Sequence, residues 1–148
     1  RVRPYEKEPG TANALHKKWQ DICIDSLINP DTKYTYKSVC KGIVEAFDKF
    51  PIDESIKKPR VGIVGEILVK YMPLANNHLV DLLEKEGAEA VVPDMMDFFN
   101  YSVHGSQYRA EYLGVKKSLA VISVAGIKMI ESIRKPAIDA LKKSSRFE

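Results

Sequence analysis

The chain has 148 residues, of which 45% are hydrophobic and 29% are charged, and its formal net charge is +3. This length predicts one domain, or a fragment of a larger protein, that buries a core without disulfides or metal. No apolar run reaches the roughly 20 residues of a membrane-spanning helix. The 23 basic and 20 acidic residues are interspersed, which argues against a nucleic-acid partner because such proteins gather basic residues on one face.

Cysteine usage and the start of the chain predict a cytoplasmic location. Cys23 and Cys40 stand far apart with no C-x-x-C pair, so reduced thiols are favoured over a disulfide framework. The sequence begins at Arg1 and shows no secretory leader. We therefore expect an intracellular protein, and the absence of an initial methionine favours a fragment.

Residues 1–52 predict an antiparallel helical hairpin. A first helix, which Thr11 can cap, carries apolar residues at spacings of three and four and ends before Pro30. A second helix carries an apolar stripe that starts at Tyr36, and Pro51 cannot continue it. The other apolar positions are Leu15, Trp19, Ile22, Cys23, Leu27, Cys40, Ile43, Phe47 and Phe50.

The next part of the chain predicts strand, helix and strand. After a polar linker, the apolar run at residues 61–65 indicates a buried parallel strand. Asn76 or Asn77 can cap the following helix, and Gly87 stands where a left-handed residue ends it. Residues 88–92 return as the second strand. A crossover of this length predicts that the two strands are parallel.

The remainder of the chain predicts helices. Asp94 can cap a short helix that ends near Phe99 and lays Met and Phe side chains against the sheet. Beyond Gly105 the spacing is helical again, and residues 121–124 fit a helix better than a strand because the spacing of three and four continues past them. Pro136 suits the first turn of a final helix.

These elements predict an α/β fold with a Rossmann-like βαβ unit, a short parallel sheet and helix-rich flanks. We divide it into a helical hairpin at 1–52, a βαβ core at 58–101 and C-terminal helices at 105–148. Two parallel strands leave open edges and rarely stand alone. We therefore expect the sheet to be completed by sequence outside this chain or by a second copy.

The segment that joins the first strand to its helix is the candidate ligand site, because ligands of open α/β sheets gather at the carboxyl ends of strands. It lacks the glycine patterns of dinucleotide and triphosphate loops. In the alternative interpretation Asn76 is a helix cap, while Glu66 and Lys70 are solvated. The candidate residues are Gly65, Glu66, Lys70, Tyr71, Asn76, Asn77 and His78.

The remaining chemistry-bearing residues predict neither a catalytic site nor a metal site. The two cysteines could be iron–sulfur ligands, but both lie on apolar helix stripes and cannot fill four ligand positions, so buried thiols are favoured. The three histidines are scattered and predict surface positions. They are His16, His78 and His104.

Two further groups each allow a functional and a structural interpretation. Asp94 and Asp97 could act as an acid–base pair, although capping and dipole pairing at a helix start explain them more simply. Three tyrosines and two phenylalanines could stack a flat ligand such as adenine, although core and interface packing is favoured. They are Phe98, Phe99, Tyr101, Tyr108 and Tyr112.

The sequences KPRVGIVGEILVKYMPLANN at residues 58–77 and EGAEAVVPD at residues 86–94 carry a family resemblance. With RVRPY at the start, RKP at 134–136 and SRFE at the end, they resemble the 2-hydroxyacyl-CoA dehydratase activase-related proteins. In that family, ATPase activase modules are joined to a region that is similar to dehydratase subunits. This chain resembles the latter region.

The resemblance implies a noncatalytic module for assembly or docking that contacts a CoA ester through the candidate segment. The implied partners are the remaining domains of the parent protein or a dehydratase subunit, with a homo-oligomer as a further expectation. An iron–sulfur cluster and ATP would belong to the parent protein and not to this fragment. The alternatives are a part of an iron–sulfur dehydratase-like subunit and, more weakly, a flavodoxin-like ligand-binding module.

The chain departs from the family pattern at Tyr71-Met72-Pro73. Cluster-binding dehydratase subunits place a cysteine shortly before the proline after a comparable strand, and closer relatives often carry histidine at the position of Met72. This segment has neither residue, so we expect no cluster and no polar role for position 72. The phosphate loops of an activase are absent as well.

Overall fold

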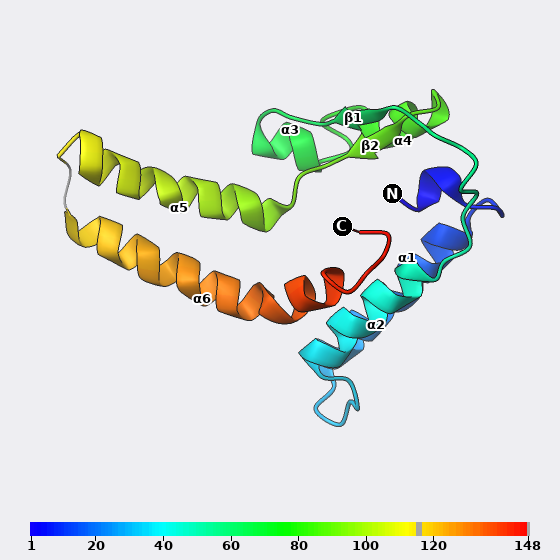
Figure 1. Ribbon diagram of the computed structural model, residues 1–148, viewed down its shortest axis with the longest axis horizontal. Coiled ribbons are helices and arrows are strands. Elements are labelled where there is room, and N and C mark those ends of the chain that lie inside the picture. The colour runs from blue at the N-terminus through cyan, green and yellow to red at the C-terminus, as the bar shows by residue number, and fades with distance from the viewer. Residues whose placement is uncertain (115–116, 148) are drawn as a thin grey trace. The chain divides into compact units, whose positions relative to one another are not determined.

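The computed structural model describes residues 1–114 and 117–147. It is a mixed α/β structure with long helices and a short parallel sheet (Figure 1). The chain divides into two compact units. The first contains Arg1–Val91 and Pro136–Glu148, and the second contains Val92–Lys135.

The predicted helical hairpin is confirmed in the first unit. A short 3-10 helix, η1 (Arg3–Tyr5), precedes α1 (Thr11–Ile28) and α2 (Tyr36–Asp48), and the two α-helices pack against each other. Figure 1 shows them side by side. Thr35 and Ser38 form a capping box at the start of α2, which satisfies backbone groups that a helix end leaves unpaired.

The prediction that Thr11 caps α1 is wrong. The N-cap residue is Gly10, with φ +89°, and a more distant carboxylate takes the role of the cap. Glu6 accepts hydrogen bonds from the backbone N–H groups of Gly10 and Ala12, both at 2.8 Å. A carboxylate at this position satisfies the first free donors of the helix and complements its dipole, so Thr11 begins the helix instead.

A glycine allows α1 and α2 to approach closely. A Cβ atom built on Gly42 would overlap Trp19 Cη2 and would lie 3.0 Å from Cζ3 and 3.1 Å from Cζ2. Real Cβ contacts are essentially never shorter than 3.0 Å. The indole ring therefore occupies space that any other residue at position 42 would fill.

The buried apolar core of the first unit lies beside the helical hairpin. Val2, Ala12 and Phe50 form one buried cluster, against which half-buried side chains pack. These are Leu15, Phe47, Ile52 and Phe147. Phe50, predicted on the stripe of the second helix, lies beyond the end of α2 and is buried there. The two ends of the described chain thus meet at one core.

The predicted pair of parallel strands is confirmed. β1 (Arg60–Gly62) pairs with β2 (Glu89–Val91), and Val61 lies opposite Ala90. Between them lie α3 (Ile67–Tyr71) and α4 (Leu79–Lys85), of which the sequence predicted only the second. Gly87 has φ +88° at the end of α4, as predicted.

The prediction that the first strand is buried is wrong. All three residues of β1 are exposed, and Val64 just beyond it is 83% exposed. Ile63 and Ala88 are buried. The apolar run was interpreted as a strand covered on both faces, but the buried apolar residues lie at the ends of the pair, Ile63 just after β1 and Ala88 just before β2.

The second unit contains α5 (Met95–Tyr112) and most of α6 (Lys117–Leu141). Asp94 caps α5 by accepting the backbone N–H of Met96 at 3.1 Å, as predicted. The predicted short helix is wrong, because α5 continues through Gly105 to Tyr112. Residues 121–124 are helical, as predicted.

The prediction that Pro136 lies in the first turn of a final helix is wrong, because Pro136 lies inside α6. A proline in a helix interior removes one backbone hydrogen bond and clashes with the preceding turn. α6 nevertheless continues to Leu141. In the part of the chain that the structure describes, no helix is both long and apolar enough to cross a membrane.

Candidate functional site

The segment after β1, which was predicted to be a ligand-binding loop, contains the short helix α3. Gly65 has φ +131°, a conformation that only glycine adopts readily, and it turns the chain out of the strand. Glu66 then caps α3, since its Oε2 accepts the backbone N–H groups of Leu68 at 2.9 Å and Val69 at 3.2 Å. Its carboxylate is therefore used within the segment.

Asn76 fastens the end of α3 to the start of α4. Its Nδ2 donates to the carbonyl oxygen of Val69 at 2.9 Å and lies 3.4 Å from that of Lys70. Its Oδ1 accepts the backbone N–H of Leu79 at 3.1 Å. The alternative interpretation of Asn76 as a cap is confirmed, although the N-cap position itself is His78.

Asn77 and His78 are consecutive residues with left-handed backbones, at φ 55° and 54°. The His78 N–H donates to the carbonyl oxygen of Pro73 at 2.8 Å, which closes this turn. Both side chains are exposed, and His78 Nδ1 lies 3.7 Å from Asp81 Oδ2. Non-glycine residues pay an energetic cost in this conformation, and the cost is lowest for Asn.

Lys70 and Tyr71 end α3 and interact with each other. The Lys70 ammonium lies 4.8 Å from the centre of the Tyr71 ring, within the range of a cation–π interaction. Both side chains are half-buried. Lys70, Asn77 and His78 therefore bring an ammonium, an amide and an imidazole to one segment, a set that can donate hydrogen bonds to an anion but contains no nucleophile beside a base.

The backbone of α4 offers less to an anion than the sequence predicted. Asn76 already takes the N–H of Leu79, and the His78 carbonyl oxygen accepts the N–H of Leu82. With only Leu79–Lys85 in the helix, the dipole at its start is small. Recognition of an anion would therefore depend on the side chains of the segment.

The role of Asn76 predicts a stability effect. Replacing Asn76 by alanine is expected to cost about 1 to 2 kcal/mol of unfolding free energy, because a helix start loses its cap and two carbonyl groups lose a donor. Urea unfolding followed by circular dichroism measures this change. Asn77→Gly is the control, because it removes a neighbouring side chain and suits the left-handed backbone. Equal stability of Asn76→Ala and the native chain would contradict the fastening role.

The surface positions of the histidines and the buried thiol of Cys40 are confirmed, whereas Cys23 is less buried than predicted. His16, His78 and His104 are exposed, Cys40 is buried and Cys23 is half-buried. Among residues 1–114 and 117–147, no three His, Cys, Asp or Glu side chains gather in a way that could hold a metal ion.

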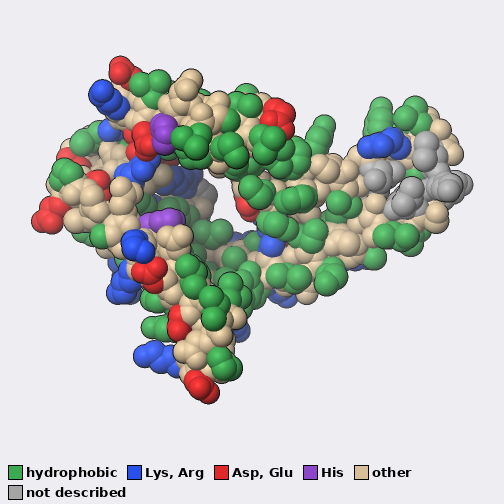
Figure 2. Space-filling model, turned by 180° about the vertical axis from the view of Figure 1, so that it is seen from behind, with side chains coloured by type: hydrophobic (Ala, Val, Ile, Leu, Met, Phe, Trp, Pro, Cys, Tyr) green, Lys and Arg blue, Asp and Glu red, His purple; other side chains and the backbone are tan. Residues whose placement is uncertain are grey.

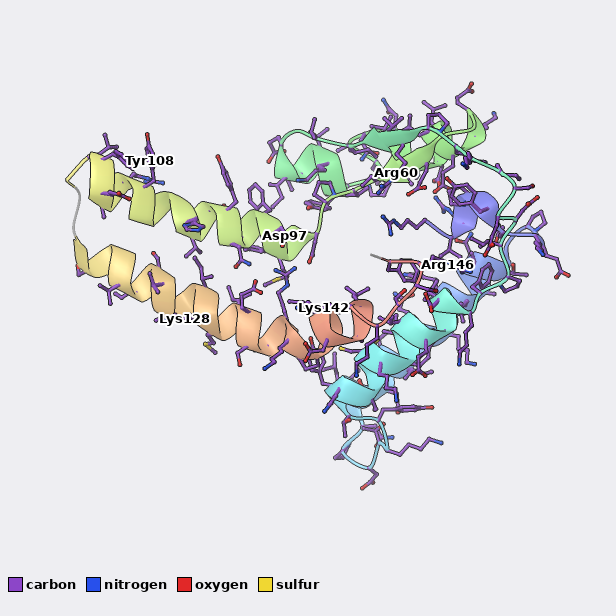
Figure 3. The ribbon with its side chains drawn as sticks, viewed as in Figure 1. Arg60, Asp97, Tyr108, Lys128, Lys142 and Arg146 are labelled. Atoms are coloured by element: carbon purple, nitrogen blue, oxygen red, sulfur yellow. The ribbon has the colours of Figure 1, made fainter. Side chains whose placement is uncertain are left out.

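Asp94 and Asp97 share one partner in the second unit. Arg134 Nη2 lies 3.1 Å from Asp94 Oδ2, while Nη1 lies 3.0 Å from Asp97 Oδ1 and from Glu131 Oε1. Asp97 is labelled in Figure 3. These ion pairs join the start of α5 to α6, and the capping role of Asp94 confirms its structural interpretation.

The core packing predicted for the tyrosines is wrong, whereas their packing at an interface stays a prediction. Tyr101, Tyr108 and Tyr112 are all exposed on α5, and the last two stack on each other with ring centres 4.6 Å apart. Stacking with a flat ligand stays a prediction. The amphipathic spacing that suggested packing also occurs on helices whose apolar side is uncovered.

One cluster that the sequence did not reveal surrounds a buried carboxylate on β2. Glu89 is 5% exposed, and its Oε2 accepts the Tyr5 hydroxyl at 2.9 Å. Its Oε1 lies 3.2 Å from Arg60 Nε, an ion-pair distance without the alignment of a hydrogen bond. A hollow of about 420 Å³ adjoins these side chains and reaches Arg146. Figure 3 labels Arg60 and Arg146.

A second ion pair from the same N-terminal segment reaches α4. Arg3 Nε lies 2.6 Å from Glu84 Oε2, and Arg3 Nη2 lies 2.9 Å from Asp81 Oδ1. The partners in both clusters are far apart in the sequence. The only signal for the first cluster was a charged residue, Glu89, in a predicted apolar strand.

No family model, curated protein or solved structure matches this chain.

Several large apolar side chains are exposed around α3. Figure 2 shows hydrophobic side chains gathered over the region of α3. The exposed large hydrophobic side chains of residues 64–74 are Val64, Leu68, Val69, Met72 and Leu74. We call these five residues the α3 patch.

Proposed function

We propose that this chain is a noncatalytic assembly or docking module of an acyl-CoA dehydratase activase-related protein. In this proposal the βαβ unit is one part of a Rossmann-like sheet, and the remaining domains of the parent protein or a dehydratase subunit complete it. The sequence resemblance at residues 58–77 and 86–94 supports the family. The open sheet and the α3 patch support the docking role.

The α3 patch is the observation that carries the docking role. Val64 is 83% and Leu74 is 81% exposed, and Leu68 and Val69 of the short helix between them are exposed as well. Single exposed apolar residues are ordinary, but several within one short segment mark an interaction surface. Burial of this patch would contribute roughly 25 cal/mol per Å² of apolar surface removed from water.

The docking role is tested by mixing the 148-residue chain with the remaining domains of the parent protein and, separately, with a dehydratase subunit. We expect a complex with at least one of them in size-exclusion chromatography with light scattering. Leu68→Glu should weaken it at least tenfold, since a buried unpaired carboxylate is costly. Leu27→Glu is the control, because Leu27 is 85% exposed at the end of α1. No complex with either partner would contradict the proposal.

We also propose that the segment from Gly65 to His78 contacts a CoA ester. Support comes from Lys70, Asn77 and His78, whose side chains can donate hydrogen bonds to phosphate groups. Isothermal titration calorimetry with CoA thioesters tests this part. We expect weak binding that Lys70→Ala reduces and Lys128→Ala, in α6, does not. An absence of heat at millimolar ligand would contradict it.

A further inference from the structure

The hydrogen bonds between the strands show which backbone groups β1 presents to its outer edge. Glu89 N–H donates to the carbonyl oxygen of Pro59 at 2.8 Å, and Ile63 N–H donates to that of Val91 at 2.9 Å. Backbone groups of successive residues alternate in direction along a strand. Residues 59, 61 and 63 therefore face β2, and Arg60 and Gly62 turn their N–H and C=O groups to the other side. β1 ends at Gly62, and a strand extended to Val64 would turn the groups of Val64 to that side as well.

No strand lies on that side in the part of the chain that the structure describes, since the sheet contains β1 and β2 alone. The backbone groups of Gly62 and Val64 have no partner among the described residues. Both residues are exposed. Unpaired strand edges are templates for a further strand, and proteins usually protect them with charges, prolines or bulges. Residues 62–64 carry neither a charge nor a proline, and Arg60 is the one charged residue of β1.

The edge of β2 differs from the edge of β1. Glu89 is buried beneath Tyr5, Ala90 and Val91 are half-buried, and α4 packs against this strand. A strand that joined this side would have to share the space with those side chains. Of the two outer edges, that of β1 is therefore the more exposed.

We propose that an extended segment of the parent protein, outside these 148 residues, pairs with the edge of β1 along residues 60–64. This inference rests on the proposed docking function and names the edge that docks. Gly62 would supply the central N–H and C=O groups of the new ladder. An apolar side chain of the added strand would cover Val64, because a strand extended to Val64 would place it on the same face as Gly62.

The short length of the edge favours a tethered strand over a separate molecule. β1 has only three residues, and a ladder of this length buries far less than the roughly 1,200 Å² of a stable interface between separate chains. A strand in the same polypeptide has a high effective concentration and needs less contact area. In a second copy, pairing about Gly62 would bring Arg60 beside Val64 and leave no apolar cover for that side chain.

Hydrogen exchange with residue-level mass spectrometry tests the proposal by comparing this chain alone with the intact parent protein. We expect the amides of Gly62 and Val64 to exchange at least tenfold more slowly in the parent. The Val61 and Ile63 amides serve as internal references, because they face β2 in both samples. Val64→Lys in the parent should restore fast exchange at Gly62, whereas Leu27→Lys, the matched control, should not.

Three other results would overturn the edge assignment. They differ in what they say about the docking function. Slower exchange at Leu74 in the parent, with Gly62 unchanged, would leave docking intact and place it on the α3 patch alone. Protection of Gly62 that rises with the concentration of the isolated chain would assign the edge to a second copy. Equal exchange at all these amides in both samples would contradict the edge assignment and docking within the parent protein, while docking to a dehydratase subunit has its own test above.

Discussion

Replacing Gly42 by alanine is expected to destabilise the helical hairpin. The new methyl group would overlap the Trp19 ring, and forcing an extra carbon into a packed contact typically costs about 1 to 3 kcal/mol. Alanine gains about 1 kcal/mol over glycine inside a helix, so the net effect is the difference of the two. Urea unfolding followed by the fluorescence of Trp19, the single tryptophan of the chain, measures it.

Gly126→Ala is the matched control for this substitution. Gly126 also lies inside a helix, α6, but nothing lies within 4 Å of a Cβ atom built on it. Alanine should stabilise that helix by about 0.5 to 1 kcal/mol, as measured by circular dichroism. The two substitutions thus have opposite expected signs. Stabilisation by Gly42→Ala would show that α1 and α2 do not approach as closely as described.

Replacing Tyr5 by phenylalanine is expected to cost about 1.5 to 3 kcal/mol, the usual contribution of a hydrogen bond to a charged group. The loss is large because Glu89 is buried and its other oxygen has only the poorly aligned Arg60. The same urea titration measures it. Tyr101→Phe, at an exposed tyrosine of α5, should change stability by less than about 0.5 kcal/mol. Equal effects of the two would contradict the role of the Tyr5 hydroxyl.

Tyr5 also predicts a loss of stability at alkaline pH. Burial, followed by the hydrogen bond to Glu89 and the charge of that carboxylate, raises the pKa of Tyr5 above its ordinary value, which is about 10. The folded state therefore holds the phenol proton more tightly than the unfolded state. The resulting stabilisation is full below the unfolded pKa and is lost as the pH rises through the folded one.

Urea titrations across this alkaline range measure the linkage. The unfolding free energy of the native chain should fall more steeply above pH 10 than that of Tyr5→Phe. Other tyrosines and lysines titrate equally in both proteins, so the difference between the two curves isolates Tyr5. Parallel curves would show that the Tyr5 phenol is not held by Glu89.

At the candidate site, local patterns predicted some features and missed others. The position of the segment after β1 and the cap role of Asn76 followed from local patterns. The helix α3 did not, because five residues with a proline soon after them carry too little periodicity to identify a helix. Its start depends on the Glu66 cap and its end on Asn76, and both are contacts that a periodic pattern does not express.

Burial was the property that the sequence predicted least well. The apolar run of β1 resembles the buried strands of complete α/β sheets, yet Val61 and Val64 are exposed. Hydropathy indicates which residues would gain from burial, whereas the presence of a covering layer depends on other elements. In the proposed docking function, the layer that covers these side chains comes from outside the chain.

The sequence by itself determined the features that depend on neighbouring residues: the helical hairpin, the parallel direction of the two strands, the Asp94 cap and the left-handed Gly87. Spacing, capping and crossover length are local properties. Only the tertiary structure decided that Glu6 caps α1, that Trp19 requires Gly42 and that Tyr5 and Arg60 meet at Glu89. These contacts join distant parts of the chain, and pairwise packing or a buried charge selects them only once the fold has brought the partners together.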